Sequence, residues 1–520
     1  MPARTIMIQG TASNVGKSLL VTALCRILRQ DGWAVAPFKS QNMSNNSYVT
    51  ADGREIGRAQ GVQAQAAGVP ASPDMNPVLL KPSGDSRSQV IIHGRPHASM
   101  DFRDYRGQGF DLAANAINDS LFRLREEYEV VVIEGAGSPA EVNLKDRELV
   151  NMRIAEWAEA PVLLVADIDR GGALASLVGT LALLEPDECE RVAGLVINKF
   201  RGDRDLLRPA EDFLEQRTGK PILGVLPYLD VELEAEDSQS LPARRGGGTG
   251  AGAGAGADDG VGGLRIAALR LPRLSNFTDL DPLAQAPATT VLWVTSPAEL
   301  ADVDAVVIPG SKNTAEDLRW VWRTGLGAAV GRLAARGVPV AGICGGYQML
   351  GNRVLDPGAH ESAHAQTPGL ELLDLETAFA PLAAKVTERT VAEVTADQGP
   401  FAGLAGMTVG GYEIHKGQTS LGAAARPLLL GEAGPAGPKV LGASDQAGQV
   451  WGTYLHDIFH NDGLRRAWLN WLRRRRGLPP VAAADGDAPG REETFDRLAA
   501  AVRAALDMGR VYDILGIARR

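Results

Sequence analysis

The chain has 520 residues, of which 45% are hydrophobic and 22% charged, as expected for a globular protein with two or three domains. Its formal net charge of −10 argues against a nucleic-acid-binding protein, whose contact surface would be basic. The three cysteines are widely spaced, which predicts a reducing, cytoplasmic environment and no disulfide framework. No export signal is visible, and no run of 18 apolar residues predicts a membrane span.

Composition divides the chain into two large parts. The Gly/Ala-rich stretch 245–263 can bury little apolar surface, so we expect a flexible linker there. The predicted domains are therefore 1–244 and 264–475, followed by a tail over 476–520. Within that tail, apolar residues at helical spacing over 494–515 predict a helix that packs on a domain.

Short apolar runs alternate with helical patterns on both sides of the linker. This alternation predicts two doubly wound α/β domains with largely parallel sheets. Before the linker, the expected strands are Thr5–Gln9, Ala34–Phe38, Val130–Ile133, Val162–Ala166, Val192–Ile197 and Ile222–Val225, and the expected helices include Lys17–Gln30 and Asp111–Glu127. After it, the expected strands are Leu264–Leu269, Ala305–Pro309 and Val338–Ile343, and the expected helices are Thr314–Ala335 and Gly346–Leu350.

The segment from Gly10 to Ser18 is typical of a phosphate-binding loop, because an apolar strand precedes it and an amphipathic helix follows. Five residues separate Gly10 from Gly16, one more than in the standard pattern. Backbone N–H groups at the helix start would surround phosphate oxygens, Lys17 would neutralise their charge, and Ser18 would offer its hydroxyl to Mg²⁺. The alternative is an ordinary glycine-rich turn. The candidate ATP-binding residues in this loop are Gly10, Thr11, Asn14, Gly16, Lys17 and Ser18.

The longer loop resembles that of the dethiobiotin synthetase family, which uses ATP to phosphorylate a carboxylate or carbamate. In that family an acidic residue after a strand binds the metal. The resemblance implies this role for Glu134, at the strand edge where ligands collect in open α/β sheets, unless it is an exposed loop carboxylate. Asp52 is a second metal candidate, although Asp-Gly is also an ordinary turn sequence. Asn198 and Lys199 resemble the segment that recognises adenine in these proteins; otherwise they form a solvated strand end.

Cys344 lies in Gly342-Ile-Cys-Gly-Gly346, between an apolar strand and a helix. Flanking glycines are typical of a nucleophile elbow, where the backbone is strained and closely packed. The helix start would favour the thiolate, and backbone N–H groups there and near Pro309-Gly310-Ser311 would form an oxyanion hole. His456 would act as general base and then as general acid. A buried structural cysteine is the alternative.

These residues resemble class I glutamine amidotransferases, whose nucleophile motif is similar to 342–351 and whose histidine motif is similar to Tyr454-Leu-His456. Members with a full triad carry Glu two positions after the histidine, whereas this chain has Ile458, so the residue that orients His456 is left open. The order of motifs from residue 1 to about 475 further resembles the cobyric acid synthase family. The segments that carry this resemblance are Lys39–Tyr48, Glu55–Gln60, Met75–Pro82, Gly410–His415 and Gly452–Asp462.

That resemblance implies ATP- and glutamine-dependent amidation of the b, d, e and g carboxylates of adenosylcobyrinic acid a,c-diamide. ATP and Mg²⁺ would be needed, the corrinoid and glutamine would be the substrates, and neither nucleic acid nor a membrane would be a partner; a homo-oligomer is left open. Polar residues within 39–47 would line the corrinoid site, although an Asn/Ser-rich stretch is ordinarily a solvated loop.

Three other functions fit part of the pattern. The a,c-diamide synthase shares both half-sites, although Gln41–Tyr48 favours the cobyric acid synthase pattern. A regulatory NTPase of the partition type would leave Cys344 and His456 without a role, and a binding protein with a degenerate amidotransferase domain would explain Ile458. The HExxH sequence His360–His364 is not expected to bind zinc, because the Pro-Gly pairs on either side leave too little room for a helix.

Overall fold

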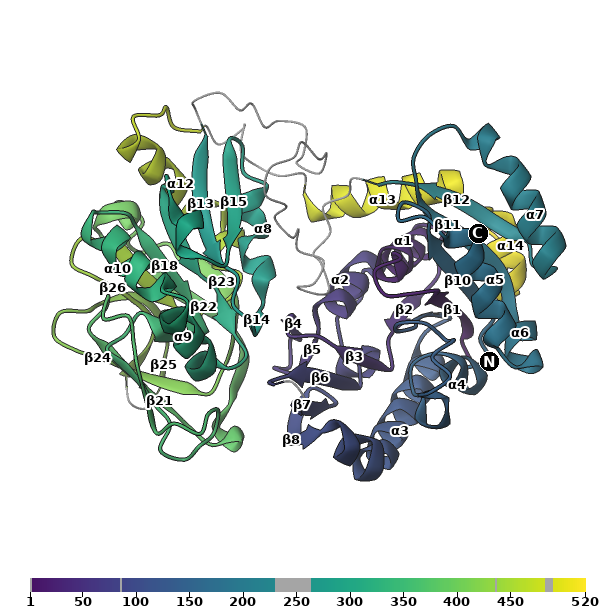
Figure 1. The fold of residues 1–520 in the computed structure, drawn as a ribbon, viewed down its shortest axis with the longest axis horizontal. Helices are drawn as coiled ribbons and strands as arrows, with labels where there is room; N and C mark the ends of the chain where they lie inside the picture. Colours follow the sequence, from purple (N-terminus) through teal and green to yellow (C-terminus); the bar gives the residue numbers. More distant parts are fainter. Residues whose placement is uncertain (1, 85–86, 230–262, 435–436, 482–489) are drawn as a thin grey trace.

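The computed structural model describes residues 2–84, 87–229, 263–434, 437–481 and 490–520. Two α/β units lie side by side (Figure 1): the first unit contains β1–β12 and the second unit contains β13–β27. The predicted linker, 245–263, lies outside the described residues except for Gly263. The two-unit α/β organisation predicted from the sequence is confirmed.

The first unit is organised around a six-stranded sheet whose strands are all parallel, in the order β12-β11-β10-β1-β9-β2. Every residue of β9 and β10 is buried, which explains why these strands read as continuous apolar runs. All six predicted strands of this part are present. Their bounds are β1 Arg4–Gly10, β2 Val35–Phe38, β9 Val130–Glu134, β10 Val162–Asp167, β11 Val192–Phe200 and β12 Ile222–Pro227.

Helices cover both faces of this sheet. Helix α1 has the predicted bounds, whereas α3 begins nine residues before the predicted start, at an Asp101 cap that accepts a hydrogen bond from the backbone of Asp104. The helices of the first unit are α1 Lys17–Gln30, α2 Arg58–Ala67, α3 Phe102–Glu127, α4 Met152–Trp157, α5 Ala173–Leu183, α6 Pro186–Arg191 and α7 Arg208–Thr218.

Between β2 and α3 the first unit carries an additional small sheet and a hairpin, which the sequence analysis did not predict. The sheet has the order β3-β6-β7-β8, and the hairpin pairs β4 with β5. In Figure 1 these strands lie on the side of the first unit that faces the second. Their bounds are β3 Gln41–Met43, β4 Ser47–Val49, β5 Glu55–Gly57, β6 Val78–Pro82, β7 Arg87–Ile92 and β8 Arg95–Asp101.

The second unit is organised around a nine-stranded mixed sheet. Its first five strands, in the order β15-β13-β16-β18-β27, are parallel, and β26, β25, β22 and β23 continue the sheet in antiparallel fashion. The strand bounds are β13 Leu264–Leu269, β15 Thr289–Val294, β16 Ala305–Ile308, β18 Val340–Ile343, β22 Val386–Val394, β23 Thr408–His415, β25 Arg426–Gly434, β26 Gly437–Ser444 and β27 Val450–Thr453. The three predicted strands are confirmed.

Two smaller sheets complete the second unit, β20-β19-β21-β24 and the pair β14-β17. The single helix predicted over 314–335 is wrong: two helices form, because Gly325 has a left-handed φ of 78° between them. Strand bounds are β14 Leu274–Ser275, β17 Gly310–Ser311, β19 Arg353–Leu355, β20 Gln366–Pro368, β21 Leu375–Phe379 and β24 Gly417–Leu421. Helix bounds are α8 Asp281–Ala284, α9 Thr314–Arg323, α10 Leu326–Ala335, α11 Gly345–Met349 and α12 Asp462–Arg475.

The C-terminal tail returns to the first unit. It forms α13 (Arg491–Ala505) and α14 (Met508–Leu515) instead of one helix, and Figure 1 shows both beside the first unit, away from α12. Leu498 and Val502 are fully buried in the same apolar cluster as Leu24 of α1. Arg26 of α1 also forms an ion pair of 2.7 Å with Glu492. The first unit is therefore built from both ends of the chain.

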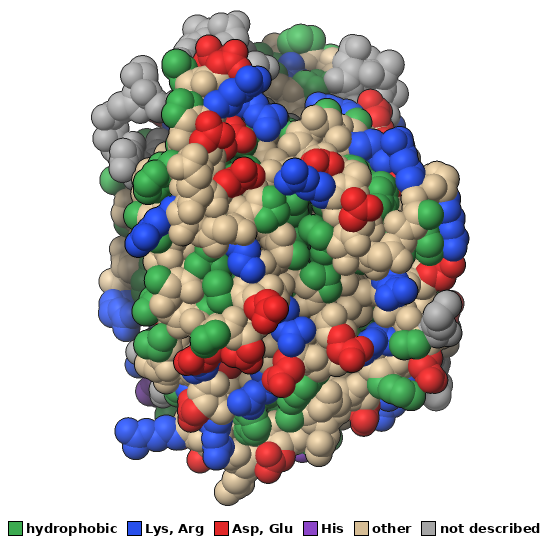
Figure 2. Space-filling model, turned by 90° about the vertical axis from the view of Figure 1, so that its right-hand side faces the viewer, with side chains coloured by type: hydrophobic (Ala, Val, Ile, Leu, Met, Phe, Trp, Pro, Cys, Tyr) green, Lys and Arg blue, Asp and Glu red, His purple; other side chains and the backbone are tan. Residues whose placement is uncertain are grey.

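No helix in the described part of the chain is both long and apolar enough to cross a bilayer. Figure 2 shows the face of the first unit that points away from the second, where Lys and Arg side chains are interspersed with Asp and Glu. On this face charges of the two signs alternate over short distances.

Candidate active sites

The predicted phosphate loop connects β1, an inner strand of the six-stranded sheet, to α1. Gly16 has a φ of 102°, and a Cβ there would lie 2.1 Å from Asn198 Nδ2, so this position requires glycine. Lys17 is buried and its Nζ donates to the carbonyls of Ala12 (3.0 Å) and Gly137 (3.2 Å). The ammonium group is thus held inside the loop, where a phosphate group would meet it.

Asn198 and Lys199 both contact this loop from the end of β11. Asn198 Nδ2 donates to the carbonyl of Val15 (2.7 Å), and Lys199 Nζ donates to the carbonyl of Asn14 (2.7 Å). Lys199 itself has a left-handed φ of 61°. The structure therefore brings the two residues to the phosphate loop, where they hold its backbone. Their predicted role in adenine recognition stays a prediction.

Glu134, at the end of β9, is the centre of a buried polar cluster. Its carboxylate accepts hydrogen bonds from Ser18 Oγ (2.8 Å), Lys39 Nζ (2.8 Å) and Gln63 Nε2 (2.6 Å). The structure thus brings together two of the three predicted metal ligands, Ser18 and Glu134. A carboxylate and a hydroxyl beside the phosphate site fit Mg²⁺, which takes few protein ligands and completes its shell with water and phosphate oxygens.

Asp52 is the predicted metal ligand that does not join this cluster. It lies in the turn between β4 and β5, its side chain is 60% exposed, and it accepts a hydrogen bond from Thr50 Oγ1. Asp52 therefore fits the alternative that Asp-Gly is an ordinary turn sequence. Asp167, like Glu134, lies at the carboxyl end of a buried parallel strand, where ligands collect in open α/β sheets. Its side chain is 7% exposed, and it pairs with Lys199 Nζ at 2.7 Å. The strand predicted from the sequence ends at Ala166, one residue before this carboxylate.

Cys344 occupies a strained turn between β18 and α11. Its φ of 51° and ψ of −106° are unfavourable for a residue with a side chain. Cβ atoms on Gly342 and Gly346 would lie 2.7 Å and 1.9 Å from backbone atoms, so both glycines are needed for the close packing around it. A Cβ on Gly345 would lie 2.8 Å from the backbone N of Ser311, which places the 310–311 segment against this turn, as the oxyanion-hole prediction requires.

His456 follows β27 and is fully buried beside Asp279. Its Nδ1 lies 2.7 Å from Asp279 Oδ2, while the other carboxylate oxygen accepts the backbone N–H of Asp457 (2.8 Å). Burial alone would lower the pKa of His456, but the charges of Asp279 and of the Cys344 thiolate outweigh it and raise the pKa to about 10. Asp279 is itself completely buried, in a 3₁₀ turn at Phe277–Leu280. The structure therefore supplies a carboxylate that can orient the imidazole.

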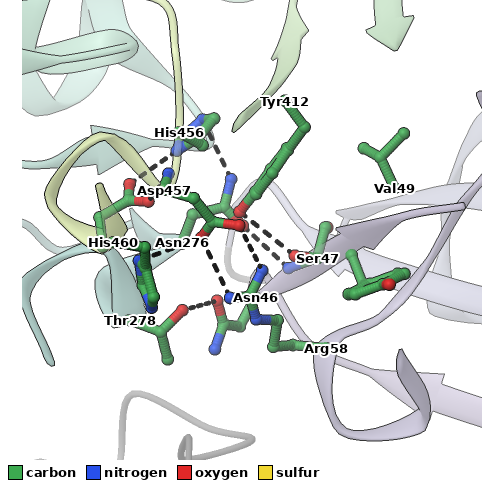
Figure 3. A network of polar contacts seen from close by, with 12 residues as sticks. Asn46, Ser47, Val49, Arg58, Asn276, Thr278, Tyr412, His456, Asp457 and His460 are labelled. Atoms are coloured by element: carbon green, nitrogen blue, oxygen red, sulfur yellow. Dashed lines mark hydrogen bonds and ion pairs between the residues drawn. The ribbon is translucent and has the colours of Figure 1, made fainter. Parts of the chain in front are cut away.

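The first unit touches this histidine site through a short polar network (Figure 3). The backbone N–H of Ser47 donates to Asn276 Oδ1 (2.8 Å), which turns Asn276 Nδ2 toward His456 Nε2 at 3.2 Å. That amide can donate to Nε2 only when the ring is neutral. Asp457 points away from the ring and pairs with Arg58 at 3.0 Å. One short chain of contacts thus connects the first unit to the His456 ring, and a separate ion pair holds the neighbouring Asp457.

Comparisons with known proteins show the family of each unit. Residues 6–242 match the CobQ/CobB/MinD/ParA nucleotide binding domain family, and residues 265–464 match the CobB/CobQ-like glutamine amidotransferase domain family. A protein of Pelotomaculum thermopropionicum called cobyric acid synthase is 55% identical over 99% of this chain and 97% of its own length. Proteins of the same name from Desulforamulus reducens (50% identical; 99% of this chain and 98% of theirs) and Sorangium cellulosum (51%; 100% of both) are similarly close. The chain belongs to the cobyric acid synthase family.

The carboxylate that contacts His456 Nδ1 is the main feature that motif reasoning missed in this family member. Asp279 lies 177 residues before His456, and nothing in its local sequence distinguishes it from an ordinary turn residue. Asn46 and Ser47, considered above as corrinoid-site residues, are buried against Asn276 and Thr278 of the second unit. The expectation that this stretch is otherwise a solvated loop is wrong, because β3 and β4 build it into the interface.

A cavity beside Cys344 is lined by residues of both units. Among its described lining residues are four lysines, one of which, Lys81, comes from β6 of the first unit. Glu361 lies there too, where its carboxylate pairs with Lys416 at 3.2 Å. The segment His360–His364 has no helical structure. The other lysines of the cavity are Lys312, Lys385 and Lys416.

Proposed function

We propose that the protein is an ATP-dependent carbon–nitrogen ligase that uses glutamine to amidate the b, d, e and g carboxylates of adenosylcobyrinic acid a,c-diamide, giving adenosylcobyric acid. The observation that carries this proposal is the full-length similarity, at about half identity, to proteins called cobyric acid synthase. The two sites described above support it, because each supplies the groups that one half of the reaction needs.

In the first unit, a substrate carboxylate would be phosphorylated beside Lys17. The carboxylate oxygen attacks the terminal phosphorus of ATP, ADP leaves, and the carbonyl carbon becomes open to attack by ammonia. Lys17 stabilises the charge on the transferred phosphoryl group. Ser18 and Glu134 would hold Mg²⁺, which supplies charge neutralisation between the phosphates when bound.

In the second unit, Cys344 would attack the side-chain amide of glutamine. His456, whose raised pKa keeps the ring protonated, holds the proton taken from the thiol and gives it to the departing ammonia, leaving a glutamyl thioester that water then hydrolyses. Backbone N–H groups of the Cys344 turn and of the 310–311 segment would stabilise the oxyanion. Ammonia would then displace phosphate from the activated carboxylate in the first unit.

We further propose that Asp279 is the positioning residue of this site. Its contact with Nδ1 holds a proton on that nitrogen and stabilises the charged ring, so that Nε2 can hold the proton taken from Cys344. The chain thus has a Cys-His-Asp arrangement in which the acid comes from an upstream turn. Ile458, at the position where a full triad has its glutamate, does not argue for a degenerate domain.

The direct test is to incubate adenosylcobyrinic acid a,c-diamide with the protein, ATP, Mg²⁺ and glutamine and to measure the corrinoid mass. We expect up to four amidations, with no reaction when ATP is omitted. With cobyrinic acid supplied in a parallel reaction, amidation at only two positions would instead identify an a,c-diamide synthase. ATP turnover without any amide product would favour a regulatory NTPase. A cytoplasmic location stays part of the proposal, supported by three cysteines that form no disulfide.

A further inference from the structure

The cavity beside Cys344 has an excess of positive charge close to the nucleophile. Four lysines line it, and each has a different environment. Lys81 and Lys385 both pair with the buried Glu55, Lys81 at 2.6 Å. Lys416 pairs with Glu361. Lys312 is the one for which the described residues provide no carboxylate partner; its Nζ donates to the amide oxygen of Gln89 at 2.8 Å.

Lys312 is held in place from both units. Its backbone N–H donates to the carbonyl of Arg273, and it directly follows the 310–311 segment that packs against the Cys344 turn. Gln89 belongs to β7 of the first unit, is 5% exposed, and is the cross-strand partner of Lys81 on β6. The side chain of Lys312 is therefore positioned by an amide from the neighbouring unit, at a fixed place near the nucleophile.

Lys312 is half-buried, and an ammonium group among other ammonium groups is electrostatically unfavourable. Burial and the charges of Lys385, Lys81 and Lys416 lower the pKa of Lys312 well below its ordinary value. An anion bound in the cavity would relieve this repulsion and complete the coordination of the ammonium group. The cavity is thus prepared for a ligand that carries a negative charge at one end.

We propose that Lys312 binds the α-carboxylate of glutamine, and that the first unit completes this subsite through Gln89 and Lys81. Glutamine attacked at Cys344 must place its charged head group elsewhere in the same cavity, where Lys312 and Glu361 offer charges complementary to its carboxylate and ammonium groups. This inference rests on the proposed glutaminase function. It implies that the second unit alone has an incomplete glutamine site.

The test compares glutamine with L-glutamine α-amide, in which a neutral amide replaces the α-carboxylate. Hydrolysis of the side-chain amide is measured in the full-length protein, as glutamate formed from glutamine and as glutamic acid α-amide formed from the analogue. The readout is the ratio of kcat/KM for the two substrates. Because both values come from one protein sample, partial unfolding cancels in the ratio. For wild type we expect a preference for glutamine of about ten- to hundredfold, the range expected for a charge-assisted contact.

In Lys312→Met we expect this preference to fall to within about threefold of unity, and in Lys312→Arg we expect it to be largely retained. Lys416→Met is the matched control: it removes the same charge from the same cavity, but from a lysine already paired with Glu361, so the preference should persist. Gln89→Leu should reduce the preference partially. If Lys312→Met does not fold, Lys312→Gln removes the charge and keeps a polar side chain of similar reach.

An unchanged preference in the Lys312 variants would overturn the proposal. An equal loss in Lys416→Met would also overturn it, because the preference would then reflect the total charge of the cavity and not a contact with Lys312. Hydrolysis of glutamine by a protein that amidates no corrinoid would refute the proposed ligase function, yet the substrate ratio would still test Lys312.

Discussion

Replacing Asp279 by asparagine should disable the glutaminase while leaving the fold intact. In the wild-type protein one carboxylate oxygen meets His456 Nδ1 at 2.7 Å and the other accepts the backbone N–H of Asp457 at 2.8 Å. An asparagine amide has a single oxygen. If that oxygen keeps the backbone contact, the NH₂ group faces Nδ1 and cannot accept its proton, so the charged ring that delivers a proton to ammonia is no longer stabilised.

The size of the effect follows from the burial of this contact. Losing one partner of a buried charged hydrogen bond costs about 2–5 kcal/mol, which is about thirty- to five-thousandfold in rate. We therefore expect kcat/KM for glutamine hydrolysis to fall within that range in Asp279→Asn. Asp457→Asn is the matched control, since it changes a neighbouring carboxylate that pairs with Arg58 and not with the ring. The asparagine oxygen can still accept from Arg58, so a loss below about tenfold is expected.

The assay should measure glutamine-dependent and ammonium-dependent amidation in the same preparations. Equal loss with both nitrogen sources would indicate general damage, and a loss in Asp457→Asn as large as in Asp279→Asn would refute the assignment of the orienting acid. The pH profile provides a separate readout, because removing the Asp279 charge should lower the pKa of His456 and shift the basic limb of the profile.

The same pair should contribute to stability in a pH-dependent way. The pKa of His456 is raised from 6.5 to about 10, so its stabilising contribution is complete below pH 6.5 and is lost as the pH rises through about 10. The difference in urea midpoint between wild type and Asp279→Asn should therefore shrink as the pH rises across this window. A difference that grew with pH would show that the histidine is neutral in the folded protein.

Three further outcomes follow from the sites and the fold. Cys344→Ser should abolish glutamine-dependent amidation but retain amidation with ammonium, and equal loss of both would contradict a separable glutaminase. Lys17→Ala should remove both activities, by on the order of a thousandfold or more, because neither nitrogen source helps without an activated carboxylate; near-normal rates would exclude Gly10–Ser18 as the ATP site. Leu498→Ala should destabilise the protein by about 2–5 kcal/mol, measured by denaturant unfolding, because this side chain is fully buried against the first unit. Phe213→Ala, at an exposed position, is its control and should change stability little; an equal loss would show that Leu498 does not help close the core.

Sequence reasoning succeeded where the signal is local. The strands of the first sheet are buried on both faces, so each appears as a continuous apolar run. Gly16 has a left-handed φ and is closely packed by Asn198, and Gly346 is closely packed by the backbone of Ile308, yet both glycines lie in turns whose sequence is a recognisable motif. The predicted bounds of α1 and β13 agree with the structure to the residue, because each element has its own local apolar pattern.

It failed where the contact depends on the tertiary fold. Asp279 reaches His456 because η5 (Phe277–Leu280) and the end of β27 are brought together in space, and no spacing rule connects residues so far apart. Lys312 acquires its environment only when β6 and β7 of the first unit pack against it. The break between α9 and α10 was missed because a single glycine inside a helical pattern is often tolerated.

The return of the tail to the first unit has a consequence for synthesis of the protein. Domains generally fold as units while the chain emerges from the ribosome, the N-terminal one first. Here the apolar cluster around Leu24 includes Leu498 and Val502, so it cannot close until residues 491–515 have been made, whereas the buried cluster of the second unit extends only from Leu264 to Leu472. A chain halted near residue 480 would carry a folded glutaminase beside a synthetase whose apolar face is still open to chaperones and proteases.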